Sequence, residues 1–71
     1  MKYDYSKLKG RIIEICGSQS VFAEKMGLSE QTISNKLKGR YKFSQNDIEK
    51  AIKILNLTKD DIPTYFFNQK V

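Results

Sequence analysis

The sequence contains no histidine, only one cysteine and only one proline. Without histidine, neither a Ser-His nor a Cys-His catalytic pair can form, and a metal site would lack both imidazole and paired thiolates. No glycine-rich phosphate-binding loop is present. Asp60 and Asp61 are adjacent carboxylates, but they point apart on a helix, and a helix N-terminus explains both. We therefore expect a protein that is not an enzyme and that needs no metal and no other cofactor.

Long apolar runs and cysteine pairs are also missing. No apolar stretch approaches the roughly 20 residues that cross a bilayer, and the first residues lack the apolar core of a secretory signal. Cys16 has no partner for an internal disulfide and lies among isoleucines, as a small core side chain would. These absences favour a protein of the reducing cytoplasm without a membrane partner.

Positive charge, in contrast, is plentiful and unevenly placed. The net charge of the 71 residues is +5. Residues 30–46 carry +3, with four basic residues and one acidic residue, while residues 1–29 carry +2 and residues 47–71 are neutral. A clustered positive field attracts polyanions, most commonly nucleic acid, with an acidic membrane or protein surface as the alternatives.

Hydrophobic spacing predicts an all-α fold, a compact single domain of five short helices over residues 1–71. The first helix covers about residues 5–16 and ends at Gly17. Ser18 caps a second helix of about eight residues, which Gly27 ends. The apolar positions expected in this second helix are Val21, Phe22 and Met26, with Ala23 small enough for close helix approach.

The third helix follows almost at once, so the second and third helices must meet at a steep angle. Ser29 caps it, and Ile33 and Leu37 turn inward before Gly39. The fourth helix begins after Ser44, with Asp47 three residues later as in a capping box. Its expected buried stripe is Ile48, Ala51, Ile52 and Leu55. Thr58 and Asp61 signal a fifth helix that Pro63 makes short or broken, and the aromatic tail at about residues 64–71 is a lid on the core or an interface.

Residues 19–38 read as a helix-turn-helix formed by the second and third helices, in which the third enters the major groove of DNA. On a helical wheel, the side of this helix away from Ile33 and Leu37 carries side chains that read base edges. These base-reading candidates are Glu30, Gln31, Ser34 and Asn35. The candidates for phosphate contacts are Gln19, Ser29, Lys36, Lys38, Arg40 and Lys42.

The stretch SQSVFAEKMGLSEQTISNKLKGR resembles the helix-turn-helix of phage Cro and lambda-repressor-type regulators. The residues that carry the resemblance are Gln19, Ala23, Gly27, Leu28 and Ile33. The closing TKDDIPTYFF is similar to the ends of small Cro-like proteins from phages and prophages of Gram-positive bacteria. The resemblance implies a five-helix lambda-repressor-like DNA-binding domain in the cytoplasm of a bacterial host cell.

The same resemblance implies that Gln19, Glu30, Gln31, Ser34 and Asn35 occupy positions that commonly contact DNA. One departure is Lys36, which precedes Leu37 where many members have an apolar residue. Lys36 could lay its methylene groups along the core and send its ammonium to a phosphate.

Two functions are compatible with these features. The first is a sequence-specific transcriptional regulator that binds double-stranded operator DNA, as a homodimer at least on DNA, because one helix reads only a few base pairs. The surface from Tyr65 to Val71 is the candidate for that dimer. The alternative is an antirepressor or modulator that keeps the fold but binds a phage repressor protein and blocks its DNA-binding surface. The basic residues after Leu37 favour DNA, whereas Glu30 favours the antirepressor.

Overall fold

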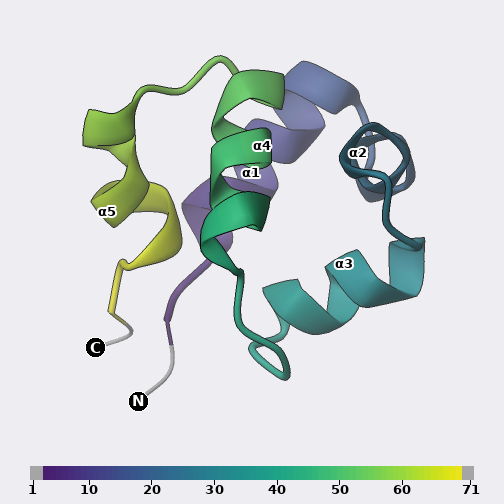
Figure 1. The fold of residues 1–71 in the computed structure, drawn as a ribbon, viewed down its shortest axis with the longest axis horizontal. Coiled ribbons are helices and arrows are strands. Elements are labelled where there is room, and N and C mark those ends of the chain that lie inside the picture. The colour runs from purple at the N-terminus through teal and green to yellow at the C-terminus, as the bar shows by residue number, and fades with distance from the viewer. Residues whose placement is uncertain (1–2, 70–71) are drawn as a thin grey trace.

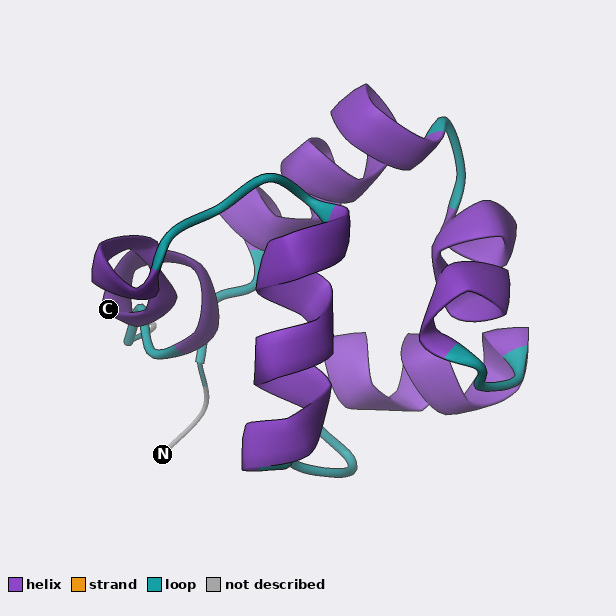
Figure 2. Ribbon diagram, turned by 45° about the horizontal axis from the view of Figure 1, so that its top comes forward, coloured by secondary structure: helices purple, strands orange, loops and turns teal. Residues whose placement is uncertain are grey.

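The structure is a computed structural model and describes residues 3–69. The described chain folds into the elements α1 (Ser6–Cys16), α2 (Gln19–Met26), α3 (Glu30–Leu37), α4 (Gln45–Ile54), a 3-10 turn η1 (Lys59–Asp61) and α5 (Ile62–Phe66). The prediction of an all-α fold with five helices is confirmed, and no strand forms among residues 3–69 (Figure 2). An isolated antiparallel bridge joins Tyr3 to Gln69. The last two residues of the predicted aromatic tail, 70 and 71, lie outside the described residues.

Helix α2 is central to the arrangement because it contacts α1, α3 and α4. In Figure 1, α4 lies in front of α1, α5 flanks this pair on one side, and α2 and α3 lie on the other. The same view shows α2 end-on and α3 side-on, so these two helices meet at the steep angle that their short connection predicts.

The core draws at least one side chain from each α-helix, so each contributes an apolar face to one centre. Its buried members are Tyr5, Leu8, Ile12, Phe22, Ala23, Met26, Ile33, Leu37, Ile48, Ala51, Ile52, Leu55 and Phe66. All four residues of the stripe predicted for α4 are among them. Cys16 packs against this cluster but is only partly buried.

Val21 is not the inward-facing residue that we predicted, because its exposed fraction is 38%. The buried positions of α2 are Phe22, Ala23 and Met26. At about 100° per residue, Val21 falls 100° from Phe22 on the side away from Met26. The short helix has room for one apolar stripe, and Val21 lies at its solvent edge.

The aromatic tail divides between two environments. Phe66 is buried and meets Phe43 edge-on at 5.4 Å between ring centroids. Phe67 is 47% exposed and meets Tyr3 edge-on at 5.5 Å. Phe43 also meets Tyr5 edge-on, and burial, with a smaller effect of Tyr3, raises the pKa of the Tyr5 hydroxyl. The lid interpretation therefore holds for Phe66, while Phe67 stays at the surface.

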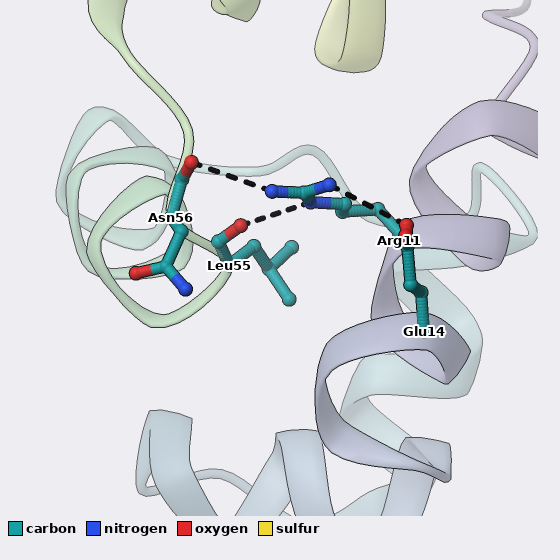
Figure 3. Close-up of polar contacts among 4 residues, drawn as sticks. All are labelled: Arg11, Glu14, Leu55 and Asn56. Atoms are coloured by element: carbon teal, nitrogen blue, oxygen red, sulfur yellow. Dashed lines mark hydrogen bonds and ion pairs between the residues drawn. The ribbon is translucent and has the colours of Figure 1, made fainter.

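Arg11 ties α1 to the end of α4 (Figure 3). Its Nε donates to the carbonyl oxygen of Leu55 at 3.0 Å and its Nη2 to that of Asn56 at 3.4 Å. The last carbonyls of a helix have no partner inside the helix and carry partial negative charge. A guanidinium from α1 therefore caps α4, next to Asn56 in the left-handed region at φ 56°.

Candidate functional site

The connection between α2 and α3 is short because one glycine reverses the chain. Gly27 ends α2 at φ 73°, a left-handed conformation that glycine adopts without a Cβ clash. Its N–H and that of Leu28 both donate to the carbonyl of Ala23, which satisfies the open end of the helix. Helix α3 begins at Glu30, three residues after Gly27.

Ser29 starts α3 as predicted. Its hydroxyl oxygen accepts from the backbone N–H of Thr32 at 3.1 Å and lies 2.8 Å from the Thr32 hydroxyl oxygen. The side chain is thus occupied as a helix cap, although the residue stays exposed. Gln19, at the start of α2, is half-buried.

Helix α3 has one buried and one open face. Ile33 and Leu37 are buried against the core, as predicted. The four base-reading candidates lie on the rest of its surface. Glu30 and Gln31 are exposed at the N-terminal end, while Ser34 and Asn35 are half-buried in the second turn. The helix therefore presents hydrogen-bonding groups and one carboxylate, with no large apolar side chain among them.

Lys36 has internal partners where we predicted a phosphate. Its Nζ lies 3.0 Å from Asp47 Oδ2 and donates to the carbonyl oxygen of Lys42 at 3.0 Å. The ammonium also sits 5.8 Å from the centroid of the Phe43 ring, within range of a cation–π contact. Its side chain is only 13% exposed, and its charge is directed inward to the first turn of α4. We therefore withdraw Lys36 from the phosphate candidates.

Asp47 is the second member of this ion pair and belongs to the capping box of α4. Ser44 N–H donates to its carboxylate at 3.0 Å, and its own N–H donates to the Ser44 hydroxyl. Burial alone would raise the pKa of this carboxyl. The hydrogen bonds from Ser44 and Lys36, together with the Lys36 charge, outweigh burial and hold the Asp47 pKa below its ordinary value of 3.8.

The loop between α3 and α4, residues 38–44, carries the remaining cations at the surface. Lys38, Arg40 and Lys42 are all exposed, and so is Tyr41 between them. No side chain of these four residues makes a hydrogen bond, ion pair or ring contact within residues 3–69. The structure thus leaves three of the predicted phosphate candidates exposed on one loop, while the Lys36 ammonium is held by the Lys42 carbonyl and Asp47.

Tyr41, which the sequence places between the basic residues as a further candidate for contact with the DNA backbone, has a side chain that is 60% exposed at the middle of the loop. A feature that the sequence did not predict is a surface hollow of about 350 Å³ between the loop and the N-terminal segment, with Lys9 and Lys38 among its lining residues. Lys9 is far from the loop in sequence, so no local pattern could have joined it to Lys38.

Within residues 3–69 no helix has the length and apolar character that spanning a bilayer requires. No three potential metal ligands of the His, Cys, Asp and Glu types gather anywhere in that range.

This α-helical framework belongs to a known family. The chain is a member of the family described as protein of unknown function, DUF739, whose model matches residues 1–69. Its fold is similar to the solution structure of the modulator of repression (MOR) of the temperate bacteriophage TP901-1 from Lactococcus lactis. That chain is 52% identical, the match covers 100% of this chain and 96% of that one, and the TM-score is 0.84. The search of curated proteins found no match.

These matches bear out the phage part of the predicted resemblance. Neither is to a Cro or lambda repressor protein, so the assignment to that helix-turn-helix family stays a prediction.

Proposed function

We propose that this protein is a modulator of repression, which binds a phage repressor protein and covers the surface with which that repressor holds its operator. The observation that carries this proposal is the 52% identity to a phage modulator of repression over the whole chain. The match covers 100% of this chain, so α3 and the loop that follows it lie within the matched region. In this proposal the protein acts by binding the repressor, without catalysis, in the cytoplasm of the bacterial host cell.

The open face of α3 supports the proposal on physical grounds. A repressor surface that binds operator DNA carries lysine, arginine and amide side chains. The Glu30 carboxylate accepts hydrogen bonds from such cations, and Gln31 and Asn35 both donate and accept. The N-terminal end of α3, which carries Glu30, therefore presents a negative charge and hydrogen-bonding groups to the basic surface of the repressor. A phosphate and a base edge of the operator would present similar groups to that surface.

Direct operator binding is the second candidate, because one observation favours it. Lys38, Arg40 and Lys42 are exposed cations without an internal partner, directly after α3 and its polar open face. In this case α3 would read base edges, Gln19 and Ser29 would approach the backbone, and a homodimer would span two half-sites. Lys36 no longer contributes to it.

A competition experiment separates the two functions. The repressor encoded by the same phage genome is bound to its labelled operator, and this protein is titrated into the complex. We expect the DNA to be released while repressor and modulator co-migrate. Glu30→Lys should prevent release, whereas Glu49→Lys makes the same charge change on α4 and should not. Binding of this protein to operator DNA alone, with no effect on the repressor, would refute the proposal.

A further inference from the structure

The loop between α3 and α4 contains three cations that the fold does not use. Lys36 pairs with Asp47, but Lys38, Arg40 and Lys42 form no ion pair within the described chain. An unpaired surface lysine is ordinary, whereas three free cations within five residues form a local positive field. Residues 47–71 carry no net charge, so the excess positive charge that follows Leu37 lies in this loop.

The loop backbone is held in place although its side chains are free. Arg40 N–H donates to the carbonyl of Asn35 at 3.0 Å, and Gly39 N–H donates to that of Lys36 at 3.1 Å. The Lys36 ammonium then binds the Lys42 carbonyl and Asp47 together. A partner would therefore order only side chains and would not have to order the backbone, which lowers the entropy cost of binding.

Tyr41 indicates which kind of polyanion this loop suits. Its ring is 60% exposed between Arg40 and Lys42. Tyrosine and arginine are among the residues enriched at the centres of protein–protein interfaces. Tyr41 beside Arg40 is therefore a pair typical of the centre of a protein–protein interface.

The neighbouring hollow adds a fourth cation and a place for a side chain. Lys9 from α1 and Lys38 both line this space of about 350 Å³. Asp4, which also lines it, accepts hydrogen bonds from the backbone N–H and the hydroxyl of Ser6. An aspartate or glutamate of a partner would find two ammonium groups at this position.

We infer that the loop of residues 38–42 and Lys9 dock an acidic segment of the repressor that this protein modulates. The inference rests on the proposed function and specifies how α3 is oriented on the repressor. Glu30 and Lys38 lie at opposite ends of α3, about 12 Å apart along the helix. Like charges repel, so the loop cannot face the basic reading surface of the repressor that Glu30 approaches. It meets an acidic segment beside that surface, and the two contacts together fix the direction of α3.

Titration calorimetry of the repressor with charge variants tests this contact. Arg40→Glu and Tyr41→Ala should each weaken repressor binding by about tenfold or more, as central interface residues do. Lys53→Glu makes the same charge change as Arg40→Glu on the exposed face of α4 and should leave the affinity unchanged. Raising the salt concentration should weaken binding by the wild type more than by Arg40→Glu. All substituted residues are exposed, and circular dichroism checks that each variant is folded.

A second measurement locates the partner segment. Zero-length carbodiimide coupling joins an amine only to a carboxylate in direct contact, so Lys38, Lys42 or Lys9 should become linked to acidic residues of the repressor, and Lys53 should not. Wild-type affinity of Arg40→Glu together with an absence of links from the loop would overturn the inference while the proposed function survives. If Arg40→Glu weakened binding of this protein to DNA but left its binding to the repressor unchanged, that result would also overturn the inference, because the loop would then bind phosphate. If the wild type does not bind the repressor, both fail.

Discussion

The Lys36 ammonium lies 3.0 Å from Asp47 Oδ2 and joins the last turn of α3 to the first turn of α4. Only 13% of the Lys36 side chain and 18% of the Asp47 side chain are exposed, so the pair is largely shielded from water. It differs in this respect from the exposed pair of Arg11 and Glu14. The ion pair fixes the end of the loop that we propose to contact the repressor.

Replacing Lys36 by Met should lower the free energy of unfolding by about 1–3 kcal/mol, because the Asp47 carboxylate and the Lys42 carbonyl each lose a charged donor. Methionine keeps the apolar length of the side chain, so core packing is largely retained. Urea denaturation measures the change. Lys38→Met is the matched control, and since Lys38 is exposed and unpaired, its effect should stay within about 0.5 kcal/mol. Equal effects of the two substitutions would contradict a structural role for the pair.

Acid should weaken the fold through Asp47. Its pKa in the folded protein is below the ordinary value of 3.8, so the folded state binds fewer protons than the unfolded state in this range. The contribution of this group is complete at neutral pH and is lost as the pH falls through the unfolded and then the folded pKa. Lys36→Met removes part of the cause of the lowered Asp47 pKa, namely the hydrogen bond and the charge of Lys36. The stability difference between wild type and Lys36→Met should therefore be smaller at about pH 3 than at about pH 7; a constant difference would contradict the assignment.

Replacing Arg11 by Met should cost about 1–3 kcal/mol of unfolding free energy, because the carbonyls of Leu55 and Asn56 lose a charged donor at the end of α4. Arg11→Lys should lie between wild type and Arg11→Met, since lysine keeps the charge but not the planar fork of donors. Glu14→Gln removes only the exposed ion pair and should cost less than about 1 kcal/mol. Thermal and urea unfolding rank the three variants, and a large effect of Glu14→Gln would shift the role to the ion pair.

The exposed face of α3 can be tested in both proposed functions with the same variants. Gln31→Ala and Asn35→Ala should weaken repressor binding, each by about 1 kcal/mol or more if it lies in the centre of the contact. If α3 instead reads DNA, the same variants should weaken operator binding by about 1–3 kcal/mol and relax base preference. Parallel titrations with repressor and with operator DNA distinguish the two results.

The helices of this protein could be predicted from local signals. Ser18, Ser29 and Ser44 each accept a hydrogen bond from the backbone N–H three residues later, as their positions before apolar repeats predicted. The left-handed glycines at 17 and 27 end α1 and α2. Such signals depend on residues within one turn of each other, so they can be read without knowing the fold.

The candidate site was predicted less completely. Residues on α3 were assigned to the correct faces because helical periodicity determines them. Lys36 was assigned to the wrong partner, since Asp47 belongs to a different helix. Val21 was placed in the core because an apolar side chain at helical spacing does not reveal where the buried stripe of a short helix ends.

The sequence by itself determined the helices, their caps, the sharp turn at Gly27 and the cluster of positive charge, because each depends on neighbours along the chain. Tertiary structure alone decided which charges are free. It turned Lys36 inward to Asp47 and left Lys38 and Arg40 unpaired. It also brought Lys9 to the surface hollow that Lys38 lines. The physical reason is that an ion pair depends on distance in space, and only packing of α1, α3 and α4 brings these groups together.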